Sequence, residues 1–365
     1  MAKKRQSNFE LLRLVSMFMI VVCHVFMFGY VKQAGSATAD MGNLFIAYFV
    51  SIFGRVGNEI FVMISAYFIC LGGFKYRTGQ VIQTLKQVEF WSIAGLIVGI
   101  VFFSQYITPK SILNGFLPIY PLAYWFVWPF LAVVILSPFL NLVIDHTEKK
   151  DLLVLTGSLI AMLSIIPMLI GRLKSGPGFW DVGIFIILYF VAALIRKYKI
   201  LDFLPVWMLF LSLVVGVVVQ GASIYNGIYK SFSLHDSRYI VQGNILNSQE
   251  SIWVMVVAVA IFELFKRTDI GSVELINKSA EASFGIYLIH FASFIHVYIF
   301  RPIVSEIYLP HIGPVLFLVI GMSMSLAMFL ALWAIEYGRI RLTVHLNKFV
   351  SRLKTKYMFR AHVFK

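Results

Sequence analysis

Apolar runs long enough to cross a lipid bilayer recur along the whole of this 365-residue chain. A membrane-spanning helix needs about 20 mostly apolar residues, because each residue adds about 1.5 Å and the hydrocarbon core is about 30 Å thick. The pattern predicts about ten such helices, with both chain ends in the cytoplasm. The predicted spans are Phe9–Tyr30, Phe45–Leu71, Val88–Phe103, Tyr124–Ile144, Leu152–Ile170, Val182–Ile195, Leu204–Val219, Ile252–Phe265, Phe284–Phe300 and Val315–Ile335.

The composition is typical of a chain whose solvent is lipid. Hydrophobic residues make up 60% of the sequence and charged residues 13%, with a mean hydropathy of +0.85. One soluble core of this length cannot bury so much apolar surface. We therefore expect an all-α polytopic integral membrane protein of the cell membrane, such as a bacterial plasma membrane. The first apolar run is too long for a cleaved signal peptide, so we expect it to remain as the first span.

The formal net charge of +14 raises the question of a nucleic-acid partner. In the predicted topology, 22 of the 31 lysines and arginines lie on the inner side and seven lie in outer loops. This is the positive-inside asymmetry of membrane proteins, and the basic C-terminal segment has no RNA-binding signature. We therefore expect no nucleic-acid partner, and expect this segment to contact anionic headgroups of the inner leaflet.

The predicted loops are too short to form a soluble domain. The sequence therefore divides into a transmembrane domain, residues 1–338, and a basic cytoplasmic tail, residues 339–365. The two cysteines, Cys23 and Cys70, both fall in predicted spans, so we expect neither a disulfide nor a metal site. The sequence does not predict an oligomeric state.

The second apolar run contains a polar interruption about halfway along. We expect a short interfacial helix near Phe45–Phe53, then a break, then a helix running inward through Phe61–Leu71. The interrupting residues are Gly54, Arg55, Gly57, Asn58 and Glu59.

Ionisable groups inside a membrane span are costly, so each one marks a candidate functional site. Arg13 and His24 are eleven residues apart, which places them on one face of a helix with Arg13 near the inner edge. Arginine suits an anionic, phosphate-bearing donor, whereas histidine suits proton abstraction from a hydroxyl. Two structural alternatives remain open: Arg13 can pair with Glu10 at the inner interface, and His24 can pack between helices.

Arg55 and Glu59 have the i, i+4 spacing of a helical ion pair. Either they neutralise each other, or they line the cavity that holds His24, where a carboxylate favours the imidazolium formed during proton abstraction. The residues alone do not decide between these alternatives. Further candidates for lining the cavity, each with a packing role as the alternative, are Ser65, Tyr67, Trp125, Tyr287 and His290.

Four segments carry a resemblance to a known family. They read NFELLRLVSMFMIVVCH (8–24), RVGNEIFVMISAYF (55–68), AYWFVWPFLAVVILSPFL (123–140) and SFGIYLIH (283–290). In this order they resemble membrane acyltransferase family 3, whose members acylate cell-surface and secreted polysaccharides. The first segment has the arginine and histidine of the family's first helix, separated by ten residues. The second segment departs from the family pattern because Ala66 replaces the usual glycine.

The resemblance implies that His24 is the catalytic base and that Arg13 contacts the donor, usually acetyl-coenzyme A, which is a co-substrate and not a bound cofactor. We expect acyl-coenzyme A to dock from the cytoplasm near Arg13 and the inner-loop cations Lys75 and Arg77, with Arg55 as a further donor-binding residue. We expect Glu59 to be catalytic together with His24. A hydroxyl of a polysaccharide or lipid-linked glycan, approaching from the outer side, then loses its proton to His24 and attacks the thioester. Membrane lipids are further expected partners.

Three other functions remain open from the sequence. A transporter or flippase of a small polar solute or glycan also has about ten helices and buried charges. A non-catalytic sensor or assembly factor, and an acyltransferase with a different acceptor, are the other two. The choice between direct transfer and an acyl-enzyme intermediate is likewise open, because no convincing nucleophile stands out.

Overall fold

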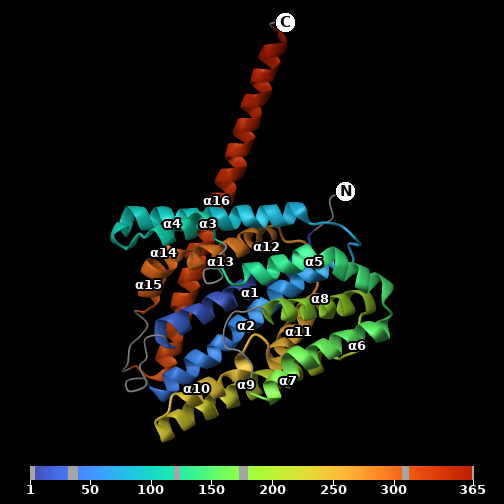
Figure 1. The fold of residues 1–365 in the computed structure, drawn as a ribbon, viewed down its shortest axis with the longest axis vertical. Coiled ribbons are helices and arrows are strands. Elements are labelled where there is room, and N and C mark those ends of the chain that lie inside the picture. The colour runs from blue at the N-terminus through green and yellow to red at the C-terminus, as the bar shows by residue number, and fades with distance from the viewer. Residues whose placement is uncertain (1–4, 32–39, 119–123, 172–179, 306–311, 364–365) are drawn as a thin grey trace.

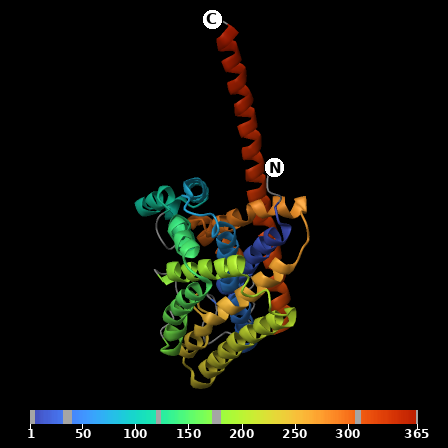
Figure 2. The ribbon, with the colours of Figure 1, turned by 90° about the vertical axis from the view of Figure 1, so that its right-hand side faces the viewer.

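The computed structural model describes residues 5–31, 40–118, 124–171, 180–305 and 312–363. The structure is 85% helical, and no strand occurs among these described residues. The expected all-α fold is therefore confirmed. Figure 1 shows a bundle of helices from which the last helix projects alone, and the perpendicular view in Figure 2 shows the same projection.

Each of the ten predicted spans coincides with one helix or with two or three consecutive helices. Short helices α4 (Pro109–Phe116), α10 (Arg238–Gly243) and α12 (Glu274–Ser279) lie between them. The helices at the predicted spans are α1 (Ser7–Phe26), α2 (Met41–Ile69), α3 (Thr78–Phe102), α5 (Val127–His146), α6 (Lys149–Ile160) with α7 (Ile166–Leu169), α8 (Trp180–Tyr198), α9 (Val206–Leu234), α11 (Ile252–Arg267), α13 (Ser283–Phe291) with α14 (Ser293–Ile295) and α15 (Arg301–Ser305), and α16 (Pro314–Val363).

The number of membrane crossings depends on how the shorter helices are counted. Within the described residues, seven helices are long and apolar enough to cross a membrane, or eight if the pair Glu274–Phe291 and Ser293–Ser305, bent by 68°, forms one span. The two remaining predicted spans are α8, with charged residues at both ends, and α11, with 16 residues. The total of about ten crossings stays a prediction.

The break predicted in the second span is wrong. In place of an interfacial helix at Phe45–Phe53 and a separate helix at Phe61–Leu71, α2 is one continuous helix of 29 residues. Asn58 and Glu59, which were expected to interrupt it, are buried among other helices. Polar side chains are tolerated at membrane depth where protein surrounds them, so the helix does not need to end there.

The glycines of α2 serve helix packing. A Cβ atom added at Gly54 would lie 2.3 Å from the Cβ of Cys23, and one at Gly57 would lie 2.6 Å from the backbone oxygen of Ser16. Small residues at this spacing allow two membrane helices to approach closely. The glycines that suggested a break from the sequence therefore hold α1 and α2 together.

Helices α1 and α2 run antiparallel at the centre of the bundle. Phe9, at the start of α1, stacks on Tyr67, at the end of α2, with ring centroids 5.1 Å apart. Helices α8, α9 and α11 pack against α2, whereas α13 and α16 pack against α1. Most of the core residues of α1 and α2 are completely buried, so these two helices form a rigid axis for the side chains they carry.

Helix ends follow local sequence signals. The Asp40 carboxylate accepts a hydrogen bond from the backbone N–H of Asn43 at 2.9 Å and so caps the start of α2. The Ser251 hydroxyl caps α11 in the same way. Helix α9 ends at His235, whose φ of 52° is the left-handed conformation common at helix C-termini.

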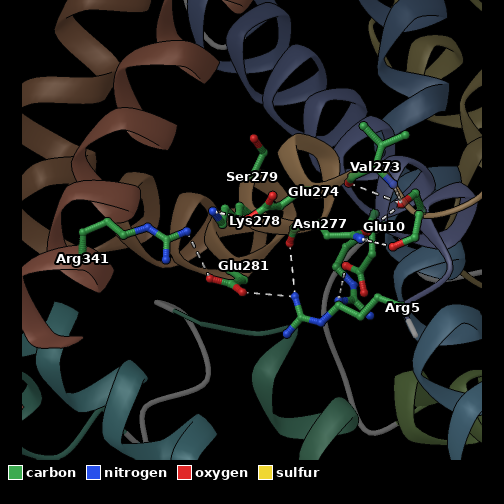
Figure 3. Close-up of polar contacts among 12 residues, drawn as sticks. Arg5, Glu10, Val273, Glu274, Asn277, Lys278, Ser279, Glu281 and Arg341 are labelled. Atoms are coloured by element: carbon green, nitrogen blue, oxygen red, sulfur yellow. Dashed lines mark hydrogen bonds and ion pairs between the residues drawn. The ribbon is translucent and has the colours of Figure 1, made fainter. Parts of the chain in front are cut away.

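One polar cluster joins the N-terminal segment to α12 and α16 (Figure 3). Glu281 accepts a hydrogen bond from Arg5 at 3.1 Å, and its second carboxylate oxygen lies 3.5 Å from Arg341. The Ser7 hydroxyl donates to the Asn277 side chain at 2.8 Å. Arg5 and Arg341 therefore lie at the same end of the bundle, although they are far apart in the sequence.

The predicted boundary between the transmembrane domain and the tail, at residues 338 and 339, falls inside a continuous helix. Helix α16 runs without interruption from Pro314 to Val363, and the segment Pro314–Ser351 is counted as one candidate span. The basic tail therefore begins as an extension of the last helix. Its contact with lipid headgroups remains a prediction.

Candidate active site

Two histidines from distant parts of the chain meet inside the bundle. Nδ1 of His24, near the end of α1, lies 3.0 Å from Nε2 of His290, near the end of α13. His290 is completely buried, whereas His24 is only partly buried. Part of the His24 residue is therefore accessible from outside the protein, whereas His290 is enclosed.

The hydrogen bonds define which nitrogen of each ring carries the proton. Nδ1 of His290 lies 2.6 Å from the backbone oxygen of Ile286, which can only accept, so this nitrogen is the donor. Nε2 of the neutral His290 ring is then an acceptor, and it receives the Nδ1 proton of His24. The remaining nitrogen, Nε2 of His24, holds a lone pair and has no hydrogen-bond partner among the described residues.

A third histidine continues this arrangement toward the outer end of the bundle. His296 donates from Nδ1 to the backbone oxygen of His290 at 2.8 Å, and its Nε2 accepts a hydrogen bond from Nε of Arg301 at 3.1 Å. The sequence analysis did not assign His296 and Arg301 to the site. The sequence offers little indication of this contact, because the six-residue separation of His290 and His296 does not match the repeat of a continuous helix.

Aromatic rings surround the two bonded histidines. The ring of Phe291 lies edge-on to His24 with centroids 4.7 Å apart, and Phe300 lies 5.3 Å from His290. Tyr287, a predicted lining residue, is buried with its ring centroid 6.0 Å from that of His290. Such a wall excludes water and strengthens electrostatic interactions inside the site.

Arg55 lies beside His24. The contact between Gly54 and Cys23 places the next residue of each helix, Arg55 and His24, at the same crossing of α1 and α2. Arg55 is within electrostatic range of Cys23, His24 and Glu250. The structure thus places Arg55 within electrostatic range of His24, and its role in the site stays a prediction.

Glu59 occupies a separate buried cluster. Its Oε1 accepts a hydrogen bond from the Gln249 side chain at 3.3 Å, and the oxygen of that amide accepts one from Asn58 at 3.2 Å. Within the described residues, Glu59 forms neither an ion pair with Arg55 nor a hydrogen bond with His24. Gln249 was not predicted, because it lies 190 positions from Glu59 in an outer connector without a motif.

The predicted donor-binding cations other than Arg55 lie toward the end of the bundle that the sequence predicts to face the cytoplasm. Arg13 pairs with Glu10 at 2.9 Å, which is the contact that the structural alternative for Arg13 anticipated. Arg77 donates to the backbone oxygen of Ile69 at 3.4 Å and so covers the end of α2. Lys75 is exposed in the turn before α3.

The other predicted lining residues do not touch the histidine pair. The Ser65 hydroxyl donates to the backbone of Phe61 within α2 at 3.3 Å. Tyr67 lies under Arg196, whose guanidinium carbon is 5.0 Å from the ring centroid. Trp125 packs edge-on against Phe126 with centroids 6.0 Å apart.

This arrangement has the features that general-base catalysis requires. They are a histidine with one oriented nitrogen that has no partner among the described residues, a cation within electrostatic range and an aromatic wall. Among the described residues, no group of three or more histidine, cysteine or acidic side chains is placed to hold a metal ion.

Comparison with known families identifies the chain. The family model described as "Acyltransferase domain" matches residues 6–334, which is nearly the whole chain. The chain therefore belongs to membrane acyltransferase family 3, as the four sequence segments predicted. No curated protein and no solved structure shows a significant match to it. The family supports a multi-pass membrane protein with acyltransferase activity.

Proposed function

We propose that this protein transfers an acyl group, in the simplest case acetyl, from cytoplasmic acyl-coenzyme A to a hydroxyl of a cell-surface or exopolysaccharide sugar. It would act in the cell membrane, where the donor approaches from the cytoplasm and the acceptor from the outer side. The proposal accounts for a base deep inside the bundle, because the two substrates have to meet across the bilayer.

The observation that carries the proposal is the unpaired Nε2 of His24. His290 accepts the proton on Nδ1, so the lone pair on Nε2 is directed away from the pair and is free to take a proton from an acceptor hydroxyl. This is the role that a carboxylate or carbonyl has in orienting a catalytic histidine elsewhere. Here another neutral histidine, itself held by a backbone carbonyl, has that role.

The proposed reaction is a direct transfer. The acceptor hydroxyl gives its proton to Nε2 of His24, and its oxygen forms a bond to the thioester carbonyl carbon, whose oxygen becomes negatively charged. The intermediate then collapses, the carbon–sulfur bond breaks, and the imidazolium returns the proton to the leaving thiolate. The products are a sugar ester and coenzyme A, and the base is regenerated without a covalent enzyme intermediate.

The donor side of the proposal rests on charge and position. Arg13 is on the same helix as His24 and about 16 Å from it along the axis, a span that suits an extended pantetheine arm. Its guanidinium contacts Glu10 but is not fully buried, so it can still face an anionic ligand. Lys75 and Arg77 are further candidates for contacts with the coenzyme A phosphates.

The test is an assay with purified protein in liposomes, acetyl-coenzyme A and an oligosaccharide acceptor. Free thiol release and ester formation are measured for wild type, His24→Ala and His146→Ala, the last being a control at an exposed histidine of α5. We expect His24→Ala to lower kcat by about 10²- to 10⁴-fold while His146→Ala retains the wild-type rate.

Equal activity of His24→Ala would show that His24 is not the base. Solute flux through the wild-type protein with no acyl transfer would instead favour the transporter alternative. In cells with equal membrane levels of each protein, wild type and His146→Ala should give the same ester content of the surface polysaccharide, and His24→Ala should give less.

A further inference from the structure

Arg55 differs from the other arginines in the described part of the chain. Every other arginine whose side chain is described there hydrogen-bonds or pairs with a carboxylate, a backbone carbonyl or a histidine nitrogen. Arg55 makes no such contact with a described residue, although it is partly buried. A guanidinium carries five N–H donors, and leaving them unused inside a membrane protein is costly.

The neighbouring carboxylates do not account for Arg55. Glu59 lies one turn further along α2 but accepts its hydrogen bond from Gln249. Glu250 is within electrostatic range of Arg55, yet the two are not within ion-pair distance, and Oε2 of Glu250 has no hydrogen-bond partner. Arg55 thus lies within electrostatic range of a buried carboxyl group without forming an ion pair with it.

The backbone at Arg55 follows directly on a close contact between α1 and α2. Gly54 leaves no room for a side chain against Cys23, so the backbone positions of Arg55 and His24 are set by the same helix crossing. A backbone held in this way needs little rearrangement during the reaction, which favours electrostatic catalysis by a side chain attached to it.

We propose that Arg55 is a catalytic residue that stabilises the negatively charged oxygen formed when the acceptor attacks the acyl carbonyl. The inference rests on the proposed acyl transfer and adds to it the group that accommodates the developing charge. His24 takes the proton, the carbonyl electrons move to oxygen, and the unpaired N–H donors of Arg55 receive that oxygen. On collapse the electrons return to the carbonyl and the thiolate leaves, so the guanidinium remains protonated throughout.

This role differs from the phosphate contact that the sequence suggested for Arg55. Arg55 is within electrostatic range of His24. Arg13 instead lies about 16 Å from His24 along the helix axis, which is the distance expected between a thioester and the distal part of its carrier. A cation adjacent to the base is therefore placed to act on the reacting carbonyl.

The experiment compares steady-state kinetics of wild type, Arg55→Gln, Arg55→Lys and Arg238→Gln in liposomes. Arg238 is an exposed arginine of the outer connector and provides the matched control. Each protein is assayed with acetyl-coenzyme A and with acetyl-pantetheine, which lacks the nucleotide phosphates. We expect Arg55→Gln to lower kcat by about 10²- to 10³-fold with both donors and to change KM little. Arg55→Lys should retain part of the rate, and Arg238→Gln all of it.

Two results would overturn the inference. If Arg55→Gln raises KM for acetyl-coenzyme A, keeps kcat and abolishes the preference for acetyl-coenzyme A over acetyl-pantetheine, then Arg55 binds phosphate. If Arg55→Gln is poorly folded and the double variant Arg55→Gln/Glu250→Gln regains full activity, then Arg55 only balances the charge of Glu250. If Arg55→Gln cannot be purified, a wild-type kcat in Arg55→Lys contradicts the inference and a reduced kcat at wild-type KM supports it.

The experiment distinguishes failure of the proposed acyl transfer from failure of the role proposed for Arg55. A wild-type protein that releases no thiol and forms no ester contradicts the proposed acyl transfer itself. A wild-type protein that is active together with a fully active Arg55→Gln contradicts only the role of Arg55.

Discussion

At the scale of single residues, the pair of His24 and His290 has a direct functional consequence. Because Nδ1 of His290 is committed to the Ile286 carbonyl, His290 can only accept from His24 and cannot pass a proton onward. In the proposed reaction, the proton that the acceptor hydroxyl gives up therefore stays on His24 until the leaving thiolate takes it. His290 is a positioning residue in this scheme, and His296 supports it from behind through the His290 backbone.

Replacing His290 tests this positioning role. We expect His290→Ala to lower kcat by about 10²-fold or more, because His24 loses the acceptor that orients its ring and selects its tautomer. His290→Gln, which retains an oxygen acceptor, should recover part of the loss at unchanged KM. The measurement is the initial rate of ester formation at saturating substrates.

A purely structural role for His290 makes a different prediction. Both His290 variants would then lose folded protein in proportion to activity, and the rate per folded molecule would equal that of wild type. Added imidazole, which can enter the space left by His290→Ala, should raise the rate of that variant only if His290 acts through its ring.

At the scale of elements, the crossing of α1 and α2 is the contact on which the site depends. We expect Gly54→Ala to lower the unfolding free energy by about 1–3 kcal/mol, because its Cβ overlaps that of Cys23. It should also lower activity, since His24 and Arg55 flank this contact. Denaturant titration of purified protein and the acyl-transfer assay provide the two measurements.

A compensating change and a matched control make this prediction specific. Gly54→Ala combined with Cys23→Gly removes the overlapping atoms and should recover stability. Gly157→Ala on α6, where a new Cβ meets nothing within 4 Å, should be neutral. If Gly54→Ala alone leaves the unfolding free energy and the activity unchanged, the packing argument is contradicted.

The outer connector before α11 is held to α2 by a buried amide. Gln249 bridges Asn58 and Glu59, so Gln249→Ala leaves a buried carboxylate without its donor. We expect a loss of about 1–3 kcal/mol in unfolding free energy, measured as a lower denaturation midpoint. Gln242→Ala, at an exposed position of α10 in the same connector, is the control and should show no change.

At the scale of the whole molecule, the polar cluster in Figure 3 bears on topology. Arg5 and Arg341 share the carboxylate of Glu281, so the start of α1 and the extension of α16 lie at one face of the membrane. An even number of crossings satisfies this arrangement, as ten or eight would, whereas seven would separate them. The basic residues near both ends predict that this face lies in the cytoplasm.

Reporter fusions test this topology. A reporter that is active only in the cytoplasm should work when fused after residue 365, and a reporter active only outside should work when inserted near Asp236. The opposite pattern, or activity of both reporters on one side, would contradict the predicted orientation. Acyl-transfer activity of each fusion serves as the control for correct folding.

The sequence alone determined the class of this protein and most of its candidate residues. Membrane embedding follows from apolar composition and run length, which are local properties that do not depend on how the helices pack. His24, His290 and Arg55 could be selected because an ionisable group at membrane depth is costly wherever its helix packs. The break predicted in the second span was wrong. Glycines and polar residues in the middle of an apolar run occur both where a helix ends and where it packs closely against another helix.

Only the tertiary structure decided how these residues work together. His24 and His290 are 266 positions apart, and their contact depends on the packing of α1 against α13. The direction of each hydrogen bond, the unpaired state of Arg55 among the described residues and the bond between Gln249 and Glu59 likewise arise between separate elements. Such contacts depend on helix rotation and crossing, which side-chain packing between elements determines and which spacing within one helix does not encode.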